Sequence, residues 1–248
     1  MNQGPYNPYS PPQSADALPA ELAFGDFDIG RTLTDAWETV KRHFPLWLGV
    51  ELVAVALIGV SACTIVGYFL ITPVIGWGLV VFWLRMLEGR PEFDDLFVGF
   101  RRFWPVVGRM LLLFVIIFAM ALAAEALLLV GELVKSMAIS GIGGLVYLAF
   151  YFGVLQRFHF AAFLAVDRDL PAIEALGASW RMTEGKVLKV LGLTVVAGVV
   201  AMSGVIACGV GAALTMTMSY LMFGSAYRQM TAAPAAPQPF APPAPAVW

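Results

Sequence analysis

The sequence predicts an all-α, polytopic membrane protein with six transmembrane helices arranged as three hairpins, each preceded by a cytoplasmic amphipathic helix. Hydrophobic residues make up 60% of the 248 residues and charged residues only 13%, whereas soluble domains carry about 25% charged residues. The chain also contains six apolar windows of the length needed to cross the hydrocarbon core of a bilayer, about 20 residues. They are 44–65, 68–87, 106–127, 141–163, 187–206 and 209–228.

The positions of the basic residues predict the orientation of these helices. Lys and Arg residues that flank membrane helices remain in the cytoplasm. With six spans, Lys135 alone falls on one side of the membrane. This bias places both termini in the cytoplasm. The basic residues on the opposite, cytoplasmic side are Arg31, Lys41, Arg42, Arg85, Arg90, Arg101, Arg102, Arg109, Arg168, Arg181, Lys186, Lys189 and Arg228.

Short amphipathic segments precede the first, third and fifth windows. Each places apolar residues, including at least one aromatic residue, at helical spacing, with acidic residues near its start and basic residues near its end, a pattern that suits the helix dipole and the headgroup layer of a membrane. A break then follows, at Pro45, at Pro105 and at residues 183–185. The aromatic residues that we expect to face lipid are Trp37, Phe44, Phe93, Phe97, Phe100 and Trp180.

The recurrence of this pattern divides the chain into a membrane domain and two tails. The membrane domain covers 26–230, and its repeat-like units cover about 31–90, 91–167 and 168–230. Residues 1–25 and 231–248 are rich in Pro, Ala and small polar residues, which is typical of disordered tails. A Pro-rich tail could also bind an aromatic groove of a protein partner.

Four residues in or near the windows are candidates for a specific role. Glu51 and Arg157 lie in the cytoplasmic halves of two windows, and they form a possible intramembrane pair. Such a pair would serve as a polar gate or proton relay, or would only fix helix packing. Cys63 and Cys208 fall near the outer face. They would form a disulfide in an oxidising compartment, or act as small packing residues.

The sequence contains no arrangement of residues that indicates catalysis or a cofactor. It has no nucleophile motif, no phosphate-binding loop and no paired catalytic carboxylates, and His43 and His159 have no ligating neighbours at suitable spacing. The net charge of −2 argues against nucleic acid as a partner. We therefore expect a non-enzymatic module that organises membrane lipids or partner proteins. The alternative is a transporter or channel for a small or amphiphilic solute; the oligomeric state stays open.

Several stretches resemble a broad bacterial superfamily of uncharacterised polytopic membrane proteins, similar to the membrane domain that accompanies some glycerophosphodiester phosphodiesterases. The resemblance covers about residues 26–230 and implies an integral protein of the bacterial inner membrane. It brings no catalytic residues, and these stretches include no phosphodiesterase domain. The residues that carry it are Ile29, Gly30, Ala36, Trp37, Pro73, Gly76, Gly89, Asp95, Leu96, Phe97, Phe100, Ala175, Ser179, Trp180, Tyr227 and Arg228.

Overall fold

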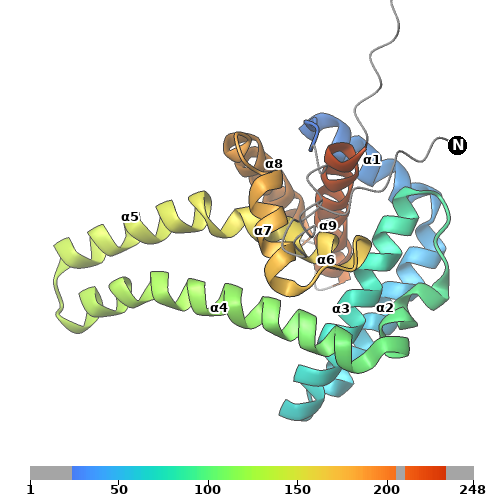
Figure 1. The fold of residues 1–248 in the computed structure, drawn as a ribbon, viewed down its shortest axis with the longest axis horizontal. Helices are drawn as coiled ribbons and strands as arrows, with labels where there is room; N and C mark the ends of the chain where they lie inside the picture. Colours follow the sequence, from blue (N-terminus) through green and yellow to red (C-terminus); the bar gives the residue numbers. More distant parts are fainter. Residues whose placement is uncertain (1–23, 205–209, 233–248) are drawn as a thin grey trace, which may run out of the picture.

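The computed structural model describes residues 24–204 and 210–232, and within these ranges the chain is helical with no β-strand. The all-α prediction is therefore confirmed for the described part of the chain. Figure 1 shows the arrangement of the helices. In chain order they are α1 (Ile29–Arg42), α2 (Phe44–Ser61), α3 (Ile65–Leu87), the 3₁₀ helix η1 (Phe93–Arg102), α4 (Phe103–Leu133), α5 (Met137–Gly153), the 3₁₀ helix η2 (Leu155–Phe160), α6 (Ala161–Asp167), α7 (Ala172–Met182), α8 (Val187–Ser203) and α9 (Val210–Thr231).

Four segments of the described chain are long and apolar enough to cross a membrane. They are α2, α3, the continuous segment Phe93–Val130 through η1 and α4, and the segment Met137–Asp167 through α5, η2 and α6. Helices α7 and α8 meet at 104° and make a fifth candidate if they are counted as one broken span. The structure is thus compatible with a membrane protein of four or five spans by this criterion, and the six-span topology stays a prediction.

The predicted window 141–163 is not one continuous α-helix, which corrects the sequence-based expectation. Helix α5 ends at Gly153 and the chain continues as η2. Glycine weakens a helix at this point. The side-chain amide of Gln156 then donates a hydrogen bond to the carbonyl of Phe152, which satisfies a carbonyl that the end of the helix would leave free. Arg157 therefore lies in a 3₁₀ segment between two α-helices.

The expected break at Pro105 is also absent. Helix η1 passes directly into α4 at Phe103, and Pro105 lies in the first turn of α4. Proline is tolerated there because the first amide groups of a helix have no carbonyl partner within the helix. The transition at this point is a change from 3₁₀ to α geometry rather than a chain break.

Helix α3 is at the centre of the fold, where it packs against α1, α2, η1, α4, α6 and α9. Its buried residues run from Val74 to Met86, in the second half of the helix, whereas Ile65 at its start is 79% exposed. The core therefore lies at one end of the bundle. The neighbouring helices contribute buried residues at this same end, among them Val50 of α2, Val106 of α4, Leu193 of α8 and Met222 of α9.

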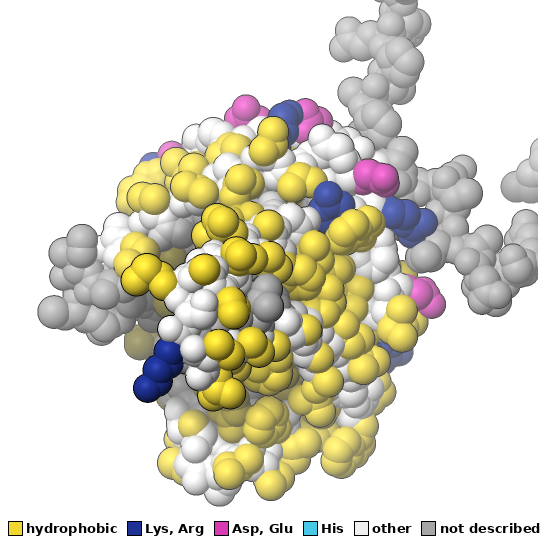
Figure 2. Space-filling model, turned by 90° about the vertical axis from the view of Figure 1, so that its left-hand side faces the viewer, with side chains coloured by type: hydrophobic (Ala, Val, Ile, Leu, Met, Phe, Trp, Pro, Cys, Tyr) yellow, Lys and Arg dark blue, Asp and Glu magenta, His cyan; other side chains and the backbone are white. Residues whose placement is uncertain are grey.

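Helices α4 and α5 form a hairpin that projects away from the other helices (Figure 1). Few of its side chains are buried, and most of its exposed residues are apolar, as Phe114, Phe118 and Leu145 illustrate. Figure 2, which looks onto this side of the molecule, shows a surface made mainly of hydrophobic side chains with few charged groups. A surface this apolar is typical of a protein that lies in lipid rather than in water.

Two glycines allow η1 to lie directly on α3. A Cβ atom on Gly78 would be 2.0 Å from the carbonyl oxygen of Leu96, and one on Gly99 would be 2.6 Å from the carbonyl oxygen of Val74. The two backbones therefore touch without intervening side chains. This contact buries Leu96 and Asp95 completely or almost so, and it leaves the aromatic face of η1 outward.

Candidate functional site

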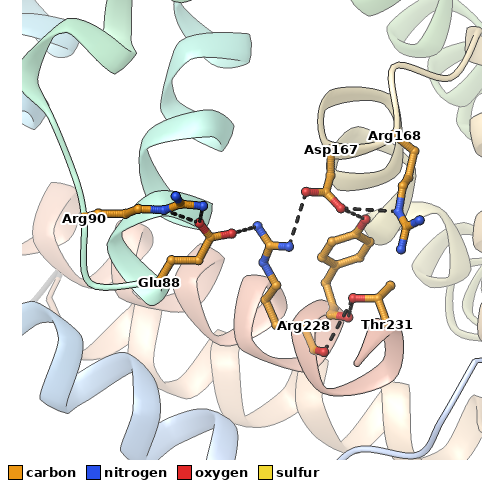
Figure 3. A network of polar contacts seen from close by, with 7 residues as sticks. Glu88, Arg90, Asp167, Arg168, Arg228 and Thr231 are labelled. Atoms are coloured by element: carbon orange, nitrogen blue, oxygen red, sulfur yellow. Dashed lines mark hydrogen bonds and ion pairs between the residues drawn. The ribbon is translucent and has the colours of Figure 1, made fainter. Parts of the chain in front are cut away.

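The end of the bundle that holds the core also carries a network of charged groups, which we call the charged end. Arg228 of α9 bridges two carboxylates from other parts of the chain, Glu88 after α3 and Asp167 at the end of α6 (Figure 3). The Arg228 guanidinium is 3.3 Å from Asp167. Because these residues belong to the ends of three different helices, their contacts tie α3, α6 and α9 together.

Further polar groups complete this network. The hydroxyl of Tyr227 donates a 2.6 Å hydrogen bond to Asp167, and Arg90 donates two hydrogen bonds to Glu88. Partial burial raises the pKa of Glu88, but hydrogen bonds from Arg90 and the charges of Arg228 and Arg90 outweigh burial and hold it below its usual value. Glu88 is therefore kept ionised, as a fixed anion between two arginines.

A groove of about 730 Å³ lies beside this network, between α1 and the ends of α3 and α9. Four acidic and four basic residues line it, so the groove has no net charge of one sign. Such a lining favours a polar or zwitterionic group over a highly charged ligand. The acidic residues are Asp26, Asp35, Glu38 and Glu88, and the basic residues are Arg31, Arg42, Arg168 and Arg228.

The segment before α1 is held at the charged end by the turn between α7 and α8. Lys186 donates hydrogen bonds to the carbonyls of Phe24 and Gly25, and Lys189 forms an ion pair with Asp26. The hydrogen bond from Lys189 is the main cause that lowers the pKa of Asp26, while burial lowers the pKa of Lys186. Both lysines thus hold residues 24–26 against the turn between α7 and α8. They also belong to the basic residues that predict which side of the membrane is cytoplasmic.

Glu51 is buried in the helix core, with 7% of its surface exposed. It accepts a 3.2 Å hydrogen bond from the indole nitrogen of Trp83 on α3, and the side chain of Thr217 on α9 is its second partner. Trp83 also stacks on Tyr220 of α9, with 5.0 Å between ring centroids. Glu51 therefore connects α2 to both α3 and α9, and it does not line the groove beside Arg228.

Among the described residues, no ion pair within 4 Å joins Arg157 to Glu51. Its guanidinium is instead 4.1 Å from the centre of the Trp180 ring on α7. The hydroxyl of Ser179 donates a hydrogen bond to the backbone carbonyl of Arg157. The structure thus places the two predicted partners in different contacts, each with a tryptophan.

All six aromatic residues that we expect to face lipid are exposed in the structure. Their exposed fractions range from 37% for Phe97 and Trp180 to 51% for Trp37. Neighbouring rings along η1 contact one another and form a continuous aromatic strip. We call this the η1 strip; it consists of Phe93, Phe97, Phe100 and Phe103.

The predicted disulfide and the predicted tails fall partly or wholly outside the described residues. Cys63 is exposed in the turn between α2 and α3. Cys208 lies outside the described residues, and so do 1–23 and 233–248, which make up most of both tails. The cysteine pair and a partner for the tails stay predictions.

Two features of the charged end were not expected from the sequence. Arg85 forms an ion pair with the buried Asp95 of η1, and Arg109 forms one with Asp169. From the sequence both arginines are interpreted only as membrane-flanking residues; Arg109 and Asp169 are 60 positions apart and leave no local pattern. The one available signal was the charged stretch 167–169, directly after an apolar window.

A buried hydrogen bond predicts different outcomes for two substitutions of Glu51. Glu51→Gln keeps an oxygen that can accept from Trp83, so the stability of the protein should change little. Glu51→Ala leaves the Trp83 indole N–H and Thr217 without this partner, and it should lower the free energy of unfolding by about 1–3 kcal/mol. Thermal unfolding of both variants in detergent would measure this. Equal destabilisation by Gln and Ala would show that the carboxylate charge, rather than the hydrogen bond, matters.

The helices and the charged end define an all-helical protein that is compatible with membrane insertion. The chain belongs to a family whose model is described as "Domain of unknown function (DUF7847)" and matches residues 90–247. No curated protein and no solved structure matches the chain. Within the described residues no group of three or more His, Cys, Asp or Glu side chains is placed to hold a metal ion.

Proposed function

We propose that this protein is a non-enzymatic integral protein of the bacterial inner membrane that binds and organises lipids at the cytoplasmic surface. In this arrangement six spans form three hairpins, both termini are cytoplasmic, and α1, η1 and α7 lie in the headgroup layer. The observation that carries the proposal is the exposure of six aromatic side chains on or directly after these three helices. Aromatic side chains on amphipathic helices insert at the boundary between headgroups and acyl chains.

Basic residues next to the aromatic residues support this placement. Lys41 lies over the Trp37 ring at 5.6 Å, and Arg157 lies over Trp180 at 4.1 Å. On η1, Arg101 and Arg102 lie between Phe100 and Phe103 of the η1 strip. An aromatic ring with a cation beside it contacts the acyl boundary and a lipid phosphate at the same time. Each of the three segments therefore combines the two groups that an anionic membrane surface attracts.

The packing of Glu51 favours this function over the transporter alternative. A transported polar solute needs a path lined with polar groups near the middle of the membrane. Glu51 is instead buried in α2, where it bonds to Trp83 of α3 and Thr217 of α9. This supports a structural role for the intramembrane carboxylate.

The depth of single residues in a lipid bilayer tests the proposal. In a Cys63→Ser, Cys208→Ser background, Trp37→Cys, Phe97→Cys and Trp180→Cys are each labelled with an environment-sensitive fluorophore and reconstituted into vesicles. We expect emission typical of the interface and quenching by lipids that carry a nitroxide in the upper acyl chain. Iodide in the aqueous phase should quench these labels weakly.

Glu38→Cys provides a matched control, because it is adjacent to Trp37 on α1 and its side chain is 55% exposed beside Lys41. Its label should be quenched by iodide and not by the lipid nitroxide. If all four labels respond equally to iodide, then the three helices do not lie on the membrane and the proposal is wrong.

A further inference from the structure

A second groove, of about 470 Å³, lies between η1, the start of α4 and the segment after α6. Three arginines line it: Arg101 and Arg102 at the end of η1 and Arg109 in α4. Asp169 is the one acidic residue of the lining. The groove therefore has a formal charge of +2, three positive groups less one negative, in contrast to the balanced groove beside Arg228. We call it the arginine groove.

Two of the three arginines pair with Asp169 within this groove. Arg109 and Arg102 both form ion pairs with its carboxylate, and the distance is 3.4 Å for Arg102. The guanidinium of Arg109 also lies 5.9 Å from the Trp77 ring centre, which limits its freedom. No ion pair within 4 Å engages Arg101 in the part of the chain that the structure describes. The groove thus holds two cations around one carboxylate and keeps a third available.

The remaining walls of the arginine groove are apolar. Six of its ten lining residues have hydrophobic side chains, which a free inorganic anion would not require. A glycerophospholipid has both parts, since its phosphate suits the guanidinium groups and its acyl chain suits the apolar wall. The six residues are Trp77, Val81, Val98, Pro105, Val106 and Val166.

Asp169 pairs with two of the arginines that line the groove. Its backbone has φ of 52°, in the left-handed region that non-glycine residues seldom adopt. It holds this conformation while its carboxylate, which is mostly exposed, contacts two arginines. Arg109 is the main reason that the pKa of Asp169 lies below its usual value. An ionised carboxylate here would compete with a lipid phosphate for the same guanidinium groups.

We infer that the arginine groove is a binding site for the phosphate of an anionic glycerophospholipid, with Arg101, Arg102 and Arg109 as its ligands and Asp169 as an intramolecular competitor. This inference rests on the proposed function and adds to it the headgroup class and the residues that select it. The competition sets the affinity, because a lipid must displace Asp169 from Arg109 and Arg102 before its phosphate makes both contacts.

Two substitutions with opposite effects test this inference. The full-length protein is delipidated in detergent, and the binding of added phosphatidylglycerol or phosphatidylcholine is measured by native mass spectrometry. Arg109→Gln should weaken phosphatidylglycerol binding about tenfold, because it removes a charge-assisted contact to the phosphate. Asp169→Asn removes the competing charge and suits the same backbone conformation; it should strengthen binding about fivefold. Phosphatidylcholine carries a cationic choline next to its phosphate, which the positive groove disfavours, so neither variant should change its binding by more than about twofold.

The controls separate this site from general effects. Lys135→Gln removes one positive charge from an exposed side chain in the turn between α4 and α5, outside both grooves, and it should leave the preference for phosphatidylglycerol unchanged. Loss of folding cannot explain a variant that binds more tightly, so Asp169→Asn keeps the test valid if Arg109→Gln is unstable. Inorganic phosphate that binds as well as phosphatidylglycerol and displaces it would overturn the lipid assignment.

An equal preference for both lipids in all variants would also overturn this inference. The proposed function would still stand in that case, provided that the labels at positions 37, 97 and 180 report the headgroup layer. If those labels report water instead, the proposed function fails independently of the result at the arginine groove.

Discussion

Replacing Gly78 with Ala is expected to separate η1 from α3 and to destabilise the fold strongly. The new Cβ would lie 2.0 Å from the carbonyl oxygen of Leu96, a backbone atom that cannot rotate away. Overpacking of this kind costs about 1–3 kcal/mol, and we expect a value near the upper end. Moving η1 away from α3 would also expose Asp95, which is 1% exposed, and weaken its ion pair with Arg85.

Gly76 is the matched control for this prediction, because it lies on the same helix, close to Gly78 but outside the contact with η1. A Cβ on Gly76 would meet nothing within 4 Å. Gly76→Ala should therefore leave the protein as stable as before, or up to about 1 kcal/mol more stable, since alanine favours the helix. The temperature at which half of the monodisperse protein is lost in detergent measures both variants. Equal stability of the two would contradict the close packing of η1 on α3.

Arg228→Gln is expected to be the most damaging substitution at the charged end. It would leave Glu88 and Asp167 facing each other without the cation that joins them. Removing one partner of a buried ion pair costs about 3–5 kcal/mol. Because the Arg228 side chain is 32% exposed, solvent screening reduces this, and we expect a loss of about 2 kcal/mol. Arg31→Gln, at an exposed pair on α1, should cost less than about 0.5 kcal/mol.

The effect of Arg228→Gln should also depend on pH. In the wild-type protein the pKa of Glu88 is held below its usual value, so its contribution to stability is present at neutral pH and is lost as the pH falls through that pKa. A protonated Glu88 has no charge, so it no longer forms an ion pair with Arg228. The difference in unfolding temperature between the two proteins should therefore shrink in acid. A difference that stays constant from neutral to acidic pH would show that the ion pair with Glu88 does not stabilise the fold.

The all-helical fold could be predicted from the sequence because its cause is local. Apolar runs of membrane length, such as those at 44–65 and 68–87, require helices whatever surrounds them, since a backbone in lipid must satisfy its own hydrogen bonds. The exposed positions of Trp37 and Phe97 could be predicted for a similar reason, because the spacing along one helix decides which face a residue occupies. The 3₁₀ geometry of η1 and η2 was not predicted, since it depends on contacts with other helices.

The pairing of charged groups could not be predicted, because it depends on how distant segments approach. Glu88 and Arg228 are 140 positions apart, and Arg109 and Asp169 are 60 positions apart. The same limit applies to the expected pair of Glu51 and Arg157, two described residues between which the structure has no ion pair within 4 Å. Both residues lie in the half of the bundle predicted to be cytoplasmic. Because α2 packs against α3 and α9, Glu51 accepts a hydrogen bond from Trp83, whereas Arg157 in η2 contacts the Trp180 ring.

The sequence by itself determined that this chain forms long apolar helices and that aromatic residues such as Trp37 and Phe97 are exposed, because hydrophobicity and helical spacing act over a few residues. The tertiary structure alone decided that the core lies at the charged end, that η1 rests on two glycines, and that two arginines pair with Asp169 in a groove that a third arginine also lines. These features depend on the distance between segments far apart in the chain, and that distance is set by the packing of all the helices together.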